Sequence, residues 1–183
     1  MPTLNAIRGY PKKAEILLFP YALDNEVPKV WDVTSFTPIP RDLLDALRDP
    51  DFEVWAHNSQ FDRTVMYAVM GPQICPPLER WRDTMIQALA HSLPAGLAQL
   101  CEVLKIEGDQ AKDKDGKRLI RLFCIPRPKN VKIRRATRET HPEDWEKFIS
   151  YAGSDIIAMR EAHKRMPKWN LSEYEIALWH VDR

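Results

Sequence analysis

The sequence predicts an α/β fold, organised as a single domain over residues 1–183. The first observation is an alternation along the chain, in which apolar runs of strand length are followed by segments with helical periodicity. The second is the length of 183 residues, which is close to that of one domain. The third is a composition of 44% hydrophobic and 29% charged residues, which is typical of a globular chain and excludes disorder throughout.

Apolar runs bounded by polar or proline-containing turns predict the strands. Residues Glu15 to Ala22 (EILLFPYA) form the first run, and Lys29 to Val33 (KVWDV) form a second, alternating run. The polar link from Leu23 to Pro28 joins them, so we expect a β-hairpin. Phe52 to Ala56 (FEVWA) is expected to be a third strand.

Apolar positions at helical spacing predict the helices. The longest such pattern runs from Pro142 to Arg165, with Trp145 and Phe148 on its apolar face and acidic residues in its first turn. The other expected helices are Pro40 to Leu47, Phe61 to Met70, Thr84 to His91, Leu97 to Leu104 and Ser172 to Val181.

Charge and cysteine content exclude several classes of protein. The net charge is +1, and no apolar run approaches the roughly 20 residues that cross a bilayer. The N-terminus lacks a basic segment followed by an apolar one, so neither a membrane protein nor a secreted one is expected. The three cysteines have no C-x-x-C spacing, which argues against a disulfide framework and indicates reduced thiols in a cytosol.

Residues 112–138 form a basic segment. The segment holds eleven basic residues against two acidic ones, a charge of +9, while the rest of the chain carries −8. A polyanion would be attracted to this segment first, which favours a nucleic-acid contact. The alternative is a solvated surface loop that is basic without a partner.

A polar stretch, His57-Asn58-Ser59-Gln60-Phe61-Asp62, lies where the third strand gives way to a helix. In α/β folds, such a junction often carries the chemistry. Asp62 also has a structural explanation, because an acid at a helix N-terminus is stabilised by the dipole and by free amides. Asp83 is a weaker candidate, and we expect it to cap the helix that begins at Thr84.

A second stretch, Tyr151-Ala152-Gly153-Ser154-Asp155, lies within the longest predicted helix. Tyr151 and Asp155 are four residues apart and therefore share one face, although a surface i, i+4 pair would show the same spacing. Gly153 costs about 1 kcal/mol relative to Ala in a helix interior. A small residue at this position therefore suggests that backbone or substrate approaches closely.

Together, the patterns H-N-x-x-F-D and Y-x-x-x-D resemble the second and third motifs of the DEDD 3′-to-5′ exonucleases. The likeness extends from Ala14 to Arg183 and resembles the N-terminal proofreading domain of bacteriophage family A DNA polymerases. Such a domain has the ribonuclease H-like (DnaQ-like exonuclease) fold, a mixed sheet flanked by helices. Residues 172–183 resemble the link into the polymerase body, and the expected location is the host cell cytosol.

The resemblance implies roles for individual residues. Two Mg²⁺ or Mn²⁺ ions would be bound by carboxylates, with Asp62 and Asp155 as ligands and Tyr151 orienting the attacking water. His57, Asn58 and Phe61 would lie against the substrate, a single-stranded DNA 3′ end. Phosphate contacts from the basic segment are assigned to five side chains: Arg118, Arg121, Lys129, Arg134 and Arg135.

The chain departs from the family pattern at the first motif, D-x-E, which supplies the other two carboxylates from the first, central strand. Asp24-Asn25-Glu26 has this spacing but falls in the expected hairpin turn, away from Asp62. We therefore expect the first strand to be missing, one ion or none to bind, and activity to be impaired. A gene fragment, a split polymerase whose body or second chain completes the sheet, and a late start codon all fit this departure.

Two function classes follow. The first is a metal-dependent 3′-to-5′ exonuclease domain of a phage-type DNA polymerase. The second is an inactive nucleic-acid-binding or polymerase-docking remnant that uses the basic segment and the open sheet edges, and an inert remnant is a third, weaker reading. Serine hydrolase, zinc protease and nucleotide-binding signatures are absent from the sequence.

Overall fold

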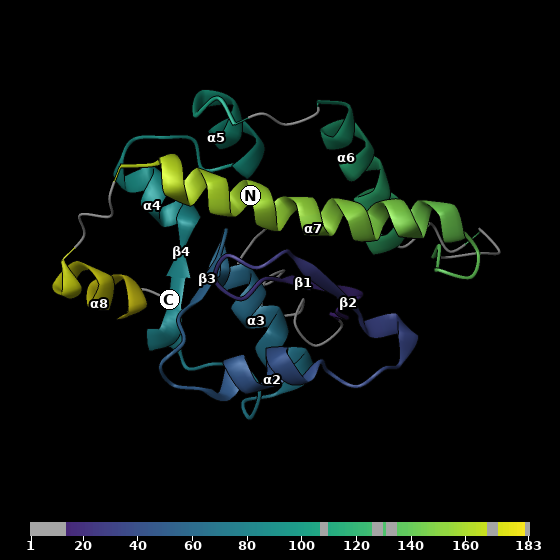
Figure 1. The fold of residues 1–183 in the computed structure, drawn as a ribbon, viewed down its shortest axis with the longest axis horizontal. Helices are drawn as coiled ribbons and strands as arrows, with labels where there is room; N and C mark the ends of the chain where they lie inside the picture. The colour runs from purple at the N-terminus through teal and green to yellow at the C-terminus, as the bar shows by residue number, and fades with distance from the viewer. Residues whose placement is uncertain (1–13, 107–109, 126–129, 131–134, 168–171, 182–183) are drawn as a thin grey trace.

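A computed structural model of the chain describes residues 14–106, 110–125, 130, 135–167 and 172–181 (Figure 1). Side chains 110–114 are outside this description. In chain order, the strands and helices are β1 (Leu18–Tyr21), β2 (Lys29–Asp32), η2 (Val33–Ser35), α2 (Arg41–Arg48), β3 (Val54–Ala56), α3 (Ser59–Met70), η3 (Leu78–Arg80), β4 (Trp81–Asp83), α4 (Thr84–Ala90), α5 (Leu97–Val103), α6 (Gln110–Cys124), α7 (Pro142–Arg165) and α8 (Glu173–Val181). The predicted α/β class is confirmed.

β1 and β2 form the predicted antiparallel hairpin. Leu18 pairs with Asp32 and Tyr21 pairs with Lys29. The turn between the strands places Asp24 in the left-handed region, with φ 46°, a conformation that Asp tolerates better than most residues. The D-x-E spacing at Asp24 and Glu26 therefore lies in the hairpin turn, as expected, and the Glu26 carboxylate pairs with Lys29 at 3.2 Å.

β3 and β4 form a parallel pair, with Val54 opposite Trp81 and Ala56 opposite Asp83. Helix α3 leaves the end of β3, and helix α4 leaves the end of β4. Because the strands are parallel, both helices begin at the carboxyl end of the pair. The sequence did not predict β4, since its three residues, W-R-D, include two charged ones.

The described strands form two separate two-stranded sheets. This differs from the prediction of one mixed sheet, because no strand among the described residues hydrogen-bonds to both pairs. The two pairs nevertheless share one apolar cluster, in which Tyr21 of β1 and Trp81 of β4 are buried and Val54 packs against them. The two strand pairs thus share a hydrophobic core, although no backbone hydrogen bonds join one pair to the other among the described residues.

Helix α7 matches the predicted bounds and runs along the long axis of the molecule, with α8 lying beyond its C-terminal end (Figure 1). Pro142 stands at its start, where a missing backbone N–H costs nothing, and Glu143 and Asp144 face the positive end of its dipole. The helix packs on both β1 and β2 and also contacts α4, α5 and α6. It therefore connects the hairpin to the helices that follow the parallel pair.

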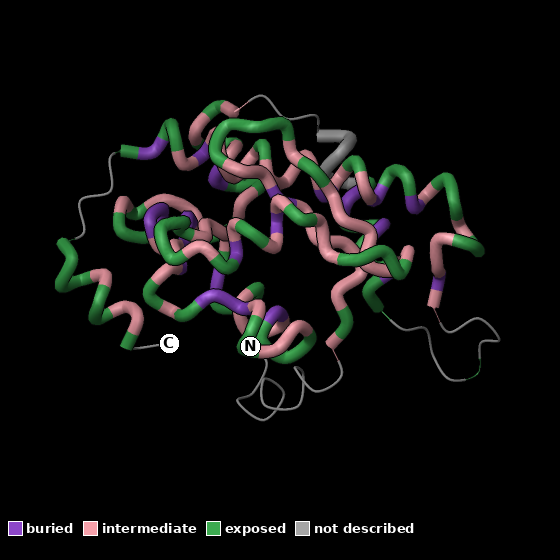
Figure 2. Tube along the Cα trace, turned by 60° about the horizontal axis from the view of Figure 1, so that its bottom comes forward, coloured by how far each residue is buried: buried purple, intermediate pink, exposed green. Residues whose placement is uncertain are grey.

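Within the described part of the chain, the core consists of three apolar clusters. The first lies between the two strand pairs, α2 and α3; the second joins α6 to the N-terminal half of α7; the third joins α4 and α5 to its C-terminal half. In Figure 2, buried residues occur as short stretches between longer intermediate and exposed ones. Helix α6 was not predicted, because its many charges conceal the apolar positions Leu119 and Phe123 that face α7.

Candidate functional site

Asp83 is buried at the carboxyl end of the β3–β4 pair, where α3 and α4 begin. It is 2% exposed, and its two carboxylate oxygens accept four hydrogen bonds. Oδ1 accepts from the amides of Asn58 (3.0 Å) and Met85 (2.8 Å), and Oδ2 accepts from the amide (2.8 Å) and hydroxyl (3.0 Å) of Ser59. One carboxylate thus caps two helices, which confirms the prediction that Asp83 caps the helix beginning at Thr84.

These bonds determine what Asp83 can do chemically. Each bond joins a carboxylate oxygen to a donor at the start of α3 or α4, and together the four bonds occupy the acceptor positions of both oxygens. An added cation would have to displace one of these donors. We therefore assign Asp83 a structural role, holding α3 in place relative to β4.

Asp62 lies in the first turn of α3, as the sequence predicted. Desolvation by the surrounding protein atoms is the larger cause that raises the pKa of Asp62 to about 7, and the negative charge of Asp83 is the second. Solvent still reaches the residue, which is exposed. Asp62 is consequently an acid that takes up or releases a proton near neutral pH, a property common among functional carboxylates.

His57 is held by protein groups on both ring nitrogens. Nε2 lies 2.8 Å from the carbonyl oxygen of Ala95 and must donate to it, so Nδ1 of the neutral ring accepts from Thr84 Oγ1 at 2.9 Å. The ring therefore connects the end of β3 to the loop before α5. Its hydrogen-bonding capacity is used within the chain, which leaves van der Waals contact as its means of touching a substrate.

Asn58 and Phe61 flank the start of α3. Asn58 has φ 67° and ψ 50°, a left-handed conformation that turns the chain from β3 into the helix. Phe61, one residue before Asp62, is 51% exposed. An exposed aromatic face beside an exposed carboxylate suits contact with a flat organic group, so the predicted role of Phe61 remains a prediction that this placement supports.

Tyr151 and Asp155 share one face of α7, one helical turn apart. Tyr151 is partly buried against the second apolar cluster, which includes Leu119 and Phe123 of α6. Gly153, between them, faces the hairpin: an added Cβ would lie 3.7 Å from Val30 Cγ2, an ordinary contact. Among the described residues, the close approach expected at Gly153 is not found, because the space there would accept a Cβ in ordinary contact with the Val30 side chain.

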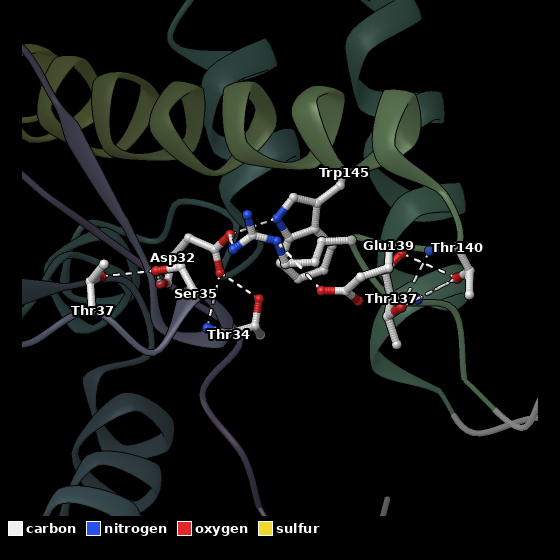
Figure 3. Close-up of polar contacts among 9 residues, drawn as sticks. Asp32, Thr34, Ser35, Thr37, Thr137, Glu139, Thr140 and Trp145 are labelled. Carbon is white, nitrogen blue, oxygen red and sulfur yellow. Dashed lines mark hydrogen bonds and ion pairs between the residues drawn. The ribbon is translucent and has the colours of Figure 1, made fainter.

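A polar network fixes the N-terminal part of α7 against β2 (Figure 3). Asp32 Oδ2 accepts from Trp145 Nε1 at 2.9 Å and pairs with Arg138 at 3.3 Å. Its Oδ1 accepts from the amide (2.9 Å) and hydroxyl (2.6 Å) of Thr34. Sequence reasoning missed Asp32, because its partners Arg138 and Trp145 lie more than 100 residues away along the chain.

The basic segment is partly neutralised within the chain. Arg118 pairs with Asp144 at 2.8 Å and with Asp115 at 3.1 Å, and Arg135 pairs with Glu15. Arg121 is exposed on α6. Lys129 and Arg134 fall outside the described residues. Three of the five predicted phosphate contacts are therefore described. Among the described residues, Arg118 and Arg135 form ion pairs and Arg121 does not.

The described residues fall short of a two-ion centre. No group of three or more His, Cys, Asp or Glu side chains within the described part of the chain is arranged to hold a metal ion. Asp83, the acid beside Asp62, is already saturated with hydrogen bonds. The structure thus places Asp62 within reach of the charge of Asp83, and it places Tyr151 against α6.

The sequence is similar to one segment of a bacteriophage protein. The chain is 34% identical over 172 residues to a protein named DNA polymerase from Bacillus phage SP02, and the match covers 92% of this chain. It covers 26% of that polymerase, so the chain spans about a quarter of its relative's length. No protein-family model matches the chain, and no solved structure matches it. Over the described residues, no helix is both long and apolar enough to cross a membrane.

Proposed function

We propose that this chain is a 3′-to-5′ exonuclease domain of a phage-type DNA polymerase, with Asp62, Tyr151 and Asp155 as its reactive side chains. One observation carries the proposal: the acid of the H-N-x-x-F-D motif lies in the first turn of α3 with its pKa raised to about 7. The similarity to a quarter of a phage DNA polymerase supports it. The substrate is the 3′ end of single-stranded DNA.

Asp62 and Asp155 are the residues we propose as ligands of Mg²⁺ or Mn²⁺, ions that prefer carboxylate oxygen. Bound ions would supply a nucleophilic water and stabilise the leaving oxygen. Two carboxylates are a weak donor set, so we expect slow degradation by this chain. A second chain or a polymerase body that adds a strand to the open edges of the two strand pairs would supply the missing acids.

The test is single-turnover degradation of a 5′-labelled single-stranded oligodeoxynucleotide by an excess of the chain, with Mg²⁺ or Mn²⁺. We expect stepwise shortening from the 3′ end that EDTA stops and that Asp62→Asn and Asp155→Asn each abolish. The control is Asp45→Asn, an acid on α2 whose side chain is 59% exposed and pairs with Arg41. Absence of shortening, or shortening that survives Asp62→Asn, would overturn the proposal.

A second candidate, a nucleic-acid-binding or polymerase-docking domain without catalysis, is favoured by the charge of +9 on residues 112–138. This candidate predicts DNA binding without cleavage, with an affinity that falls steeply as salt rises. Arg121→Ala should reduce the slope by about 1 if it contacts one phosphate, whereas binding indifferent to salt would exclude the candidate.

A further inference from the structure

Gly116 is a buried glycine inside helix α6, eight residues before the last residue of that helix. A glycine in a helix interior lowers stability relative to alanine, because it loses more backbone entropy on folding. Its backbone needs no left-handed conformation, since φ is not positive there. The reason for a glycine at this position must therefore be the space that a side chain would fill.

The ring of Tyr151 occupies that space. A Cβ built on Gly116 would lie within 3.0 Å of three atoms of the Tyr151 ring, which is closer than real Cβ contacts allow. An aromatic ring on a helix has few rotamers to retreat into, so it cannot move aside as the end of a long flexible side chain can. Any side chain at residue 116 would therefore displace the ring or push the two helices apart.

The surrounding contacts oppose separation of the helices. Arg118, two residues after Gly116, pairs with Asp144 of α7 at 2.8 Å. Phe123 meets Trp145 edge-on, with ring centroids 4.8 Å apart, and stacks on Phe148 with centroids 5.3 Å apart. Helix α6 is thus held against α7 by charge and by aromatic packing, which leaves the Tyr151 ring pressed onto the backbone at Gly116.

We propose that Gly116 is the positioning residue for Tyr151: its missing side chain seats the ring against α6 and so sets the direction of the phenol oxygen. The inference rests on the proposed function only for what Tyr151 does, namely orient the attacking water. The seating of the ring is independent of activity. Gly116 touches no substrate in this scheme and acts through Tyr151 alone.

The experiment compares Gly116→Ala with Gly153→Ala, a matched control because both glycines are inside helices and the second has room for a Cβ. In urea unfolding we expect Gly153→Ala to raise the midpoint by about 0.5 M and Gly116→Ala to lower it. In a Tyr151→Ala background the ring is gone, and Gly116→Ala should then raise the midpoint. Should Gly116→Ala fail to fold alone, recovery in the Tyr151→Ala background supports the proposal, and failure there overturns it.

A spectroscopic readout separates positioning from stability. In protein labelled with 3-fluorotyrosine, the resonance of Tyr151 is assigned by its loss in Tyr151→Phe. We expect Gly116→Ala to shift or broaden that resonance while Gly153→Ala leaves it in place. An unchanged resonance, or equal midpoint shifts for the two glycine variants, would refute the seating of Tyr151 on Gly116.

Activity then tells the two proposals apart. If the wild type degrades DNA, Gly116→Ala should lower kcat with little change in KM, since substrate binding groups are untouched. A raised KM with an unchanged kcat would contradict a positioning role. If the wild type degrades nothing, the proposed function fails, whereas the midpoint and fluorine measurements still decide whether Gly116 seats Tyr151.

Discussion

Replacing Asp83 by Asn should destabilise the chain strongly, because this carboxylate is buried and accepts four hydrogen bonds. The substitution keeps the side-chain shape but converts Oδ2 into an amide nitrogen. That atom can no longer accept from the Ser59 amide (2.8 Å) or the Ser59 hydroxyl (3.0 Å), and it places a donor against a buried donor. The bonds at Oδ1 to Asn58 and Met85 remain but lose their charge.

The magnitude follows from the number of bonds lost. A hydrogen bond to a charged group contributes about 1.5 to 3 kcal/mol, so two lost bonds amount to roughly 3 to 6 kcal/mol. This is a large share of the stability of a typical domain, which is about 5 to 15 kcal/mol. Ser59→Ala removes only the hydroxyl bond and should cost about 1.5 to 3 kcal/mol, half of the loss expected for Asp83→Asn.

The assay is urea unfolding followed by tryptophan fluorescence, because Trp81, 3% exposed, lies two residues before Asp83. We expect Asp83→Asn to lower the midpoint by more than about 1 M, and Asp45→Asn to leave it within error. A midpoint for Asp83→Asn equal to that of Asp45→Asn would show that the buried carboxylate does not hold α3 and α4, and the structural role assigned to it would be wrong.

Three further predictions concern charge and pH. The pKa of Asp62 is about 7 in the folded chain and about 3.8 in the unfolded chain. The contribution of Asp62 to stability should therefore fall as pH rises from about 4 to 7. Urea titrations in EDTA at each pH should show this fall in the wild type and not in Asp62→Asn. Burial lowers the pKa of His163 below its ordinary 6.5, so the contribution of His163 to stability should have the opposite slope and fall as pH drops below about 6.5. Comparison of His163→Gln with the wild type in the same titration isolates this contribution from the larger one of Asp62. Asp32→Asn should cost about 2 to 3 kcal/mol through the weakened bonds to Trp145 and Arg138, and calorimetry that shows an unchanged Tm would contradict the network.

The elements predicted correctly are those whose own residues determine them. The hairpin follows from two apolar runs around a polar turn, and α7 follows from a long apolar periodicity that begins at Pro142 and carries basic residues in its last turn. Strand β4 escaped prediction because three residues carry too little pattern, and its place is determined by pairing with β3. Helix α6 escaped because its charges conceal the apolar face that α7 covers.

The candidate site was predictable in part for the same reason. The first turn of α3 could be recognised from a polar motif at a strand end, and Asp83 could be recognised as a cap from its place before Thr84. The sequence did not show that Asp83 also holds the start of α3, because this contact depends on the pairing of β3 with β4. The contact of Tyr151 with Gly116 likewise exists only once α6 and α7 are packed together.

Helix α7 carries two of the three proposed reactive side chains, so its position decides whether a site can form. Contacts near both of its ends fix that position. Asp32 of β2 binds Trp145 near the start, and Gln87 of α4 lies 2.7 Å from His163 near the end. Arg160 adds bonds to the carbonyl oxygens of the hairpin turn at residues 24 and 26, at 3.2 and 2.7 Å.

None of these anchors involves a proposed metal ligand. The scaffold that positions Tyr151 and Asp155 is therefore separate from the chemistry that they would perform, and it does not depend on a bound ion for its stability. A chain with an incomplete set of carboxylates can accordingly keep α7 in place and lack only the acids themselves. This is why adding acids on one further strand is, in our proposal, enough to raise activity without rebuilding the fold.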